Sequence, residues 1–169
     1  VLDEFDAGIA RLRARYVVKF DDGIRARAGY LAGDDDRRAA ELLRAIEDPD
    51  VDAIVCARGG YGATRLLPRV SVGFSDVTAL HAIWAQAGVR SIHGAMVAAL
   101  GRGSDALAVR WTHALEGTGT ESLDGLSSIV PGRGQGPLVG GNLAALTALV
   151  GTPYAPPLDG AVLFLEDSG

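Results

Sequence analysis

Residues 51–57 form a mostly apolar run that ends at the motif Arg58-Gly59-Gly60-Tyr61-Gly62. A short apolar run that stops at a glycine-rich loop is typical of a strand buried on both faces of a parallel sheet. Residues 70–74 and 161–165 repeat the pattern, and each run is followed at once by polar residues. This recurrence constrains the fold more than any other feature of the chain, and it indicates an α/β protein.

Helical periodicity alternates with these runs. Apolar side chains at helical spacing predict helices around residues 5–12, from Asp34 to Pro49, and at residues 79–84, 95–100, 105–115 and 143–150, and residues 16–20 predict a further strand. Strands that alternate with helices build a parallel sheet flanked by helices. Ligands bind beyond the carboxyl ends of the strands in such sheets, so the motifs found there are the candidates for function.

Residues 117–137 contain six glycines and no periodic pattern. We interpret them as a linker. The predicted organisation is therefore an α/β domain over residues 1–116, the linker, and the start of a second, smaller domain over residues 138–169.

Composition excludes several classes of protein. The 16 basic and 21 acidic residues give a net charge of −5, and no run of Lys or Arg offers a surface for nucleic acid or anionic lipid. No stretch approaches the roughly 20 apolar residues that a bilayer-spanning helix needs. Cys56 is the only cysteine, which excludes an intramolecular disulfide and a multi-cysteine zinc site. We expect a cytoplasmic protein.

Ser75 lies in the sequence Gly73-Phe74-Ser75-Asp76, where a predicted strand meets a predicted helix. A serine on such a sharp turn is exposed as a nucleophile, and the amide that follows it can stabilise an oxyanion. Val77 occupies a position where the common nucleophile elbow has glycine. The alternative interpretation is that Ser75 only caps the helix.

Gly59 and Gly60 end the neighbouring predicted strand, where backbone without side chains can bring a second N–H to a substrate carbonyl. A structural turn or a phosphate-binding nest would explain them equally well. No Gly-Lys-Ser/Thr follows, so this is not a Walker loop. Glu166, at the end of the last predicted strand, is a candidate carboxylate to orient a catalytic base, or simply an exposed strand end.

A serine nucleophile needs a general base, and the chain contains three histidines. His81 follows Ser75 by six residues in the same predicted helix, so we expect it to point elsewhere and to serve packing or the surface. His113 precedes the linker and is expected to be exposed. His93, at the end of a strand predicted at residues 89–92, is the one histidine that could approach the site, as a base, in substrate binding or in a structural role.

The ordered set of motifs resembles the LD-carboxypeptidase family of serine peptidases, which includes the microcin C immunity peptidase. The resemblance covers most of the chain from about Val51 onward. The motifs that carry it are Arg58-Gly59-Gly60-Tyr61-Gly62, Arg65-Leu66-Leu67-Pro68, Gly73-Phe74-Ser75-Asp76-Val77-Thr78, His93-Gly94, Gly140-Gly141-Asn142-Leu143 and Leu163-Phe164-Leu165-Glu166-Asp167.

The resemblance implies a cytoplasmic hydrolase that removes the terminal D-alanine from murein tetrapeptides during cell-wall recycling. It implies an N-terminal domain similar to class I glutamine amidotransferases, a smaller C-terminal domain, a homodimer, and no metal or other cofactor. The alternatives are a related peptidase that cleaves peptidyl-nucleotide antibiotics, and a non-catalytic module that binds peptide or phosphate.

The resemblance also implies roles for individual residues. Ser75 would be the nucleophile and Glu166 the acidic member of a Ser-Glu-His triad, with the amides of Gly60 and Asp76 as the oxyanion hole. The residues implied to bind substrate are Arg58, Gly59, Tyr61, His93 and Asn142.

Two family features have no counterpart among these residues. The catalytic histidine lies in a Gly-His-Gly-like segment after the Glu-Asp motif, and a first strand with an Ala-Pro-Ser-like end precedes the first helix. His93-Gly94 is also followed by Ala95 where proline is common in the family. We therefore expect this chain to be a fragment of a longer polypeptide, with little activity of its own because it has no triad histidine.

Overall fold

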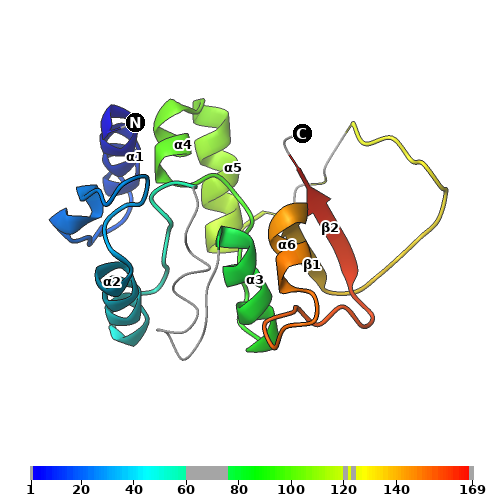
Figure 1. Ribbon diagram of the computed structural model, residues 1–169. Coiled ribbons are helices and arrows are strands. Elements are labelled where there is room, and N and C mark those ends of the chain that lie inside the picture. Colours follow the sequence, from blue (N-terminus) through cyan, green and yellow to red (C-terminus); the bar gives the residue numbers. More distant parts are fainter. Residues whose placement is uncertain (1, 60–75, 120–121, 123–124, 168–169) are drawn as a thin grey trace.

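The computed structural model describes residues 2–59, 76–119, 122 and 125–167 (Figure 1). A short 3₁₀ helix spans Asp22–Arg25. The α-helices are α1 (Leu2–Arg13), α2 (Asp35–Glu47), α3 (Asp76–Gln86), α4 (Val97–Arg102), α5 (Asp105–Glu116) and α6 (Leu143–Leu149), and the strands are β1 (Leu138–Asn142) and β2 (Val162–Glu166). None of the described helices is long and apolar enough to cross a membrane.

Helix α2 shows how local chemistry sets the helix boundaries. The Asp34 side chain accepts a hydrogen bond of 2.8 Å from the backbone N–H of Arg37, which caps the helix start. Asp35 and Asp36 place negative charge in the first turn, where the helix dipole favours it. The helix ends at Glu47, two residues before Pro49, as the sequence predicts.

The first part of the core lies between α1 and α4. At Gly8 the backbone of α1 lies directly against the start of α4, and an added Cβ would overlap the carbonyl oxygen of Val97. At Gly101 an added Cβ would overlap the carbonyl oxygen of Glu4. The two glycines therefore permit the close approach. The buried residues of this cluster are Phe5, Ile9, Leu12, Val97 and Leu100.

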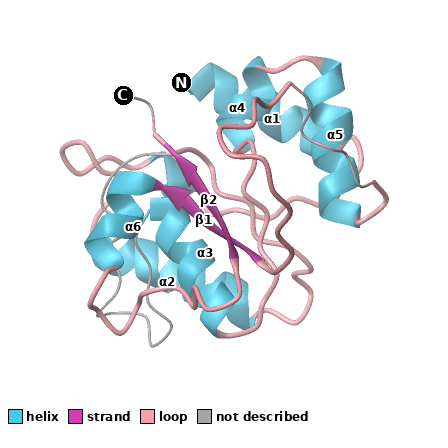
Figure 2. Cartoon of the chain, turned by 90° about the vertical axis from the view of Figure 1, so that its right-hand side faces the viewer, coloured by secondary structure: helices cyan, strands magenta, loops and turns pink. Residues whose placement is uncertain are grey.

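Strands β1 and β2 form a parallel pair in which Gly140 faces Phe164 and Asn142 faces Glu166. Helices α3 and α6 pack against β1 and against each other, so the pair is flanked by helices (Figures 1 and 2). The parallel sheet and the α/β class are thus confirmed for this part of the chain. A second buried cluster, Ala79, Ala82 and Leu149, joins α3 to α6.

Three predicted strands are not found as strands. Residues 16–20, 51–57 and 89–92 are not strands, although the helices predicted on either side of them are present. A strand needs a neighbour in a hydrogen-bonded ladder, and the backbone bonds that reach these stretches from a distant described segment are those that Cys56 and Ala57 accept from Val97 and Ala98 at the start of α4. The predicted strand at residues 70–74 lies outside the described residues, and the described part of residues 118–137 contains no helix or strand.

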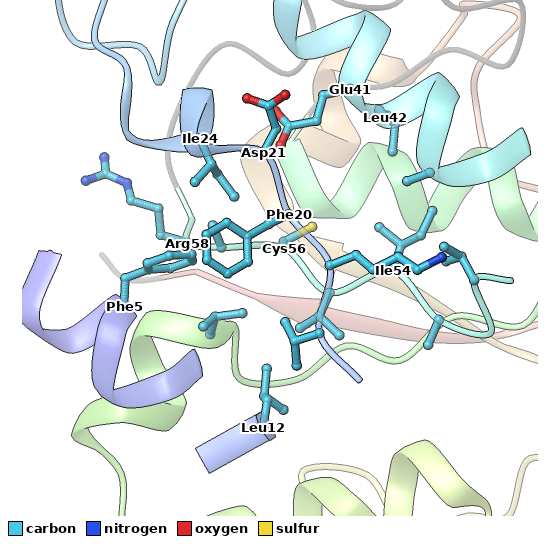
Figure 3. Close-up of a pocket in the computed structure, with 18 of the residues that line it drawn as sticks. Phe5, Leu12, Phe20, Asp21, Ile24, Glu41, Leu42, Ile54, Cys56 and Arg58 are labelled. Carbon is cyan, nitrogen blue, oxygen red and sulfur yellow. The ribbon is translucent and has the colours of Figure 1, made fainter. Parts of the chain in front are cut away.

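Residues 16–20 and 51–57, with α1 and α2, line a groove of about 1010 Å³. Figure 3 shows apolar side chains around it, including Phe5, Phe20 and Ile54, with Arg58 among the polar residues of the lining. Residues of α3, α4 and α5, among them Leu80, Val97 and Trp111, also line it, so mostly apolar side chains surround an open space beside the core.

Candidate active site

The carboxyl ends of β1 and β2 lie together, as expected for a parallel pair. Asn142 ends β1, Glu166 ends β2, and the two residues are partners in the strand register. Glu166 is half-buried and makes no hydrogen bond or ion pair with another described residue. Glu166 therefore carries its carboxylate at the shared carboxyl end of the two strands.

The start of α3 is fixed to the same edge. The backbone N–H of Asn142 donates a 2.9 Å hydrogen bond to Oγ1 of Thr78, in the first turn of α3. Thr78 is 3% exposed, so the bond is shielded from water. Helix α3 begins at Asp76, and the end of β1 is therefore tied to the turn that directly follows Ser75 in sequence.

Gly140 and Gly141 allow this contact. Their φ angles are +147° and +142°, a region that side chains rarely adopt. A Cβ on Gly140 would overlap the Phe164 carbonyl, and one on Gly141 would lie 2.5 Å from Oγ1 of Thr78. The glycine pair of this motif is therefore needed here for close packing of backbone.

Asn142 has a structural role as well as a predicted binding role. Its Oδ1 accepts a 3.1 Å hydrogen bond from the N–H of Ala145 and so caps α6. Because that oxygen is engaged, the amide nitrogen of the side chain is the group left for a ligand.

His93 extends the cluster from the other side. Its ring lies 5.1 Å, centroid to centroid, from the ring of Phe164, at an interplanar angle of 65°. Phe164 precedes Glu166 by two residues on β2, so both side chains leave the strand on the same face. His93 therefore contacts the face of β2 that carries the candidate carboxylate.

Arg58 and Gly59 lie elsewhere in the described structure. Arg58 lines the groove of Figure 3, and its Nε donates a 3.1 Å hydrogen bond to the carbonyl of Gly59. A Cβ on Gly59 would lie 3.0 Å from the methyl group of Met96, next to α4. Among the described residues, no hydrogen bond or ring contact joins Arg58 to His93, Asn142 or Glu166.

The remaining predicted site residues divide into two groups. Ser75, Gly60 and Tyr61 lie outside the described residues. Asp76 is the first residue of α3, so its backbone amide is one of those left unpaired at a helix start. The structure thus brings together the end of β1, the end of β2, the first turn of α3 and His93.

Two participants lie within the motifs, but the sequence predicts no role for them. Thr78 fixes the site through its hydroxyl, and Phe164 contacts the ring of His93. His81, expected to serve packing or the surface, is buried, at 8% exposure. Burial and the nearby His93 lower its pKa to about 4, so its ring is neutral near pH 7.

Comparison with protein families assigns both parts of the chain. Residues 2–94 match the LD-carboxypeptidase N-terminal domain. Residues 135–169 match the LD-carboxypeptidase C-terminal domain. The chain belongs to the LD-carboxypeptidase family.

Relatives within the LD-carboxypeptidase family support this placement. A probable murein peptide carboxypeptidase of Bacillus subtilis is 37% identical over 89% of this chain and 53% of its own length. A putative carboxypeptidase of Streptomyces coelicolor is 43% identical over 83% of this chain and 51% of its own length. The murein tetrapeptide carboxypeptidase of Pseudomonas aeruginosa is 33% identical over 86% of this chain and 55% of its own length. The chain spans about half the length of these curated relatives.

Solved structures show the same fold. An MccF-like protein from Bacillus anthracis superposes with a TM-score of 0.84 at 23% identity, covering 99% of this chain and 62% of that one. The microcin C7 self immunity protein MccF gives a TM-score of 0.79 at 21% identity, and the match covers 98% of this chain and 63% of that one. At these identities the similarity establishes the fold.

Proposed function

We propose that the protein is a serine LD-carboxypeptidase that releases the terminal D-alanine from murein tetrapeptides. Ser75 is the proposed nucleophile, and Glu166 is the proposed carboxylate of the triad. The relatives named as murein peptide and murein tetrapeptide carboxypeptidases, at 37% and 33% identity, support this substrate class.

One observation carries the proposal. Thr78, three residues after Ser75, accepts a hydrogen bond from Asn142, and Asn142 is the register partner of Glu166. Segments separated by about ninety residues in sequence are thereby joined at the carboxyl end of a parallel pair, where α/β proteins place their catalytic groups. A serine that only capped a helix would not require a carboxylate at this position.

The proposed mechanism follows the logic of serine acyl transfer. A histidine oriented by Glu166 takes the proton from the Ser75 hydroxyl as its oxygen attacks the scissile carbonyl. The family resemblance assigns that histidine to sequence beyond the Glu-Asp motif. The amides of Gly60 and Asp76 stabilise the oxyanion, and the same histidine then returns its proton to the D-alanine amine that leaves. Water hydrolyses the acyl-enzyme.

The decisive experiment uses the protein expressed from the complete open reading frame. Ser75→Ala should lower the release of D-alanine from a murein tetrapeptide by at least about a thousandfold, because the covalent step is lost. Ser128→Ala, in an exposed loop, is the matched control and should leave the rate unchanged. Release that survives Ser75→Ala would sink the proposal, and labelling of Ser75 by a serine-directed phosphonate would exclude a non-catalytic module.

A second substrate class is favoured by the structural similarity to MccF. An enzyme of that type would cleave a peptidyl-nucleotide antibiotic. Turnover of the tetrapeptide and of a peptidyl-nucleotide should be compared at equal enzyme concentration, and we expect the larger kcat/KM for the tetrapeptide.

We also propose, from the family resemblance, that the enzyme is cytoplasmic and homodimeric. Light scattering on the protein from the complete open reading frame tests the dimer. A monomer at micromolar concentration would contradict it.

A further inference from the structure

A chain of three contacts links α3 to β2 through His93. Nδ1 of His81 on α3 lies 2.7 Å from the hydroxyl oxygen of Ser91. The rings of His81 and His93 lie 5.5 Å apart at 43°, and His93 in turn contacts Phe164. The candidate site therefore has a histidine held from both sides, by a helix and by a strand.

We infer that His81 is a positioning residue, which holds the loop of residues 89–96 through Ser91 and thereby keeps His93 in place beside Phe164. This inference rests on the proposed function, because it assigns His93 the substrate-binding role within that site. His81 does not itself contact the substrate in this assignment.

The loop has few other restraints. Val89 and Ile92 are 52% and 45% exposed, so little apolar burial holds the loop down. Val89 donates to the carbonyl of Trp84, but from residue 90 to residue 96 no backbone N–H donates to a backbone carbonyl of a described residue. The side-chain bonds are the His81–Ser91 pair and a 2.9 Å bond from Trp111 to the carbonyl of Ala95. Loss of the His81–Ser91 bond would therefore release the part of the loop that carries His93.

The chemistry of His81 supports a role beyond filling space. Its ring is buried, yet Nε2 has no hydrogen-bond partner among the described residues. A buried polar atom without a partner is destabilising, and an apolar side chain in the same place would avoid that cost. A neutral imidazole has one donor and one acceptor nitrogen. With its proton on Nδ1, the ring donates to Ser91 and leaves only a lone pair unpaired at Nε2.

The kinetic test uses Ser91, which is exposed, so that its replacement should leave folding intact. In the protein from the complete open reading frame, Ser91→Ala should raise the KM for the tetrapeptide by about threefold to tenfold, the range expected when one hydrogen bond is lost, with kcat nearly unchanged. Ser91→Thr keeps a hydroxyl and should restore KM. His81→Phe keeps a ring beside His93 but removes the bond, and should also raise KM.

The outcomes separate positioning from a structural role. A variant that only folds less well has fewer active molecules and shows a lower apparent kcat at unchanged KM. His113→Asn, on α5 and outside the contacts among His81, Ser91, His93 and Phe164, is the histidine control and should leave KM unchanged. A rise in KM below about threefold for Ser91→Ala overturns the inference, and so does a failure of Ser91→Thr to restore KM.

An NMR measurement distinguishes this inference from the proposed function. If the wild type releases no D-alanine, the proposed function fails, and the spectra decide the inference alone. With ¹⁵N-labelled histidine, His81 should show a single neutral tautomer protonated on Nδ1, and a nuclear Overhauser effect should join His93 to Phe164. Loss of that effect in Ser91→Ala supports the inference. Its persistence, or a mixed tautomer of His81 in the wild type, overturns it.

Discussion

The backbone N–H of Asn142 and the hydroxyl of Thr78 form the hydrogen bond, 2.9 Å long, that joins the first turn of α3 to the end of β1. The bond crosses from the part of the chain that matches the N-terminal family domain to the part that matches the C-terminal one. Because the donor is a main-chain N–H, the contact depends on the hydroxyl of Thr78 and on the backbone conformation of Gly140 and Gly141, which precede Asn142.

Thr78→Val should destabilise the fold. Valine has nearly the same shape but leaves the N–H of Asn142 without its acceptor, which costs about 1–3 kcal/mol for a shielded donor. Urea unfolding measures the change, and Thr78→Ser, which keeps the hydroxyl, should recover most of it. Equal stability of the valine variant and the wild type would mean that water replaces the bond freely.

Gly141→Ala should destabilise the fold by more than backbone strain alone would account for. The φ of +142° costs a side chain about 1–3 kcal/mol, and the new Cβ would also press on the side chain of Thr78. Gly151→Ala is the matched control, because φ there is +77° and no atom lies within 4 Å of the added Cβ. We expect the loss at Gly141 to exceed the loss at Gly151 in parallel urea titrations.

Gly8→Ala should destabilise the fold although alanine is the better helix former. Helix propensity alone predicts a gain of about 1 kcal/mol. The added Cβ would overlap the carbonyl of Val97, so α1 and α4 must separate, and we expect a net loss of about 2 kcal/mol or more. Ala10→Gly, at an exposed position of α1, should cost only the propensity term of about 1 kcal/mol. A rise in Tm for Gly8→Ala would contradict this packing.

The Arg15–Glu116 pair predicts a pH dependence below neutrality. Arg15 donates to both carboxylate oxygens at 2.6 and 2.7 Å, Tyr16 adds a bond of 2.8 Å, and the pKa of Glu116 falls from 4.5 to about 2. A carboxyl group whose pKa is lower in the folded than in the unfolded protein stabilises the folded state at pH values above its unfolded pKa. For Glu116 this contribution is lost as the pH falls from about 4.5 to about 2.

The urea midpoint should therefore fall less steeply over this pH range in Glu116→Gln than in the wild type. The pair is exposed, so high salt should shrink the difference. Glu47→Gln, an exposed acid at the end of α2, serves as the control. Identical pH profiles for Glu116→Gln and the wild type would show that the pair contributes nothing.

Helices could be predicted from the sequence because their signals are local. Asp34 caps α2, Ser104 caps α5 through the N–H of Leu107, and both helices begin where those residues indicate. The stretches at residues 16–20 and 51–57 have the composition of strands, but a strand also needs a neighbour, and composition does not specify one.

The same distinction applies to the site. The sequence predicts a strand that ends near Glu166, but it places Asn142 only at the start of a helix, so the register pairing of the two residues comes from the structure. The contact of His81 with Ser91 and His93 depends on how one loop folds back onto a helix, and no spacing rule encodes it.

The groove of Figure 3 has a consequence for how this chain behaves in solution. Val17 is 92% exposed, and the backbone groups of residues 17–20 have no hydrogen-bonded partner in another described segment. Extended backbone with free donors and acceptors is a template for strands of other molecules. Concentrated preparations of residues 1–169 are therefore expected to self-associate through the backbone of residues 17–20. The lag before association should shorten as the protein concentration rises.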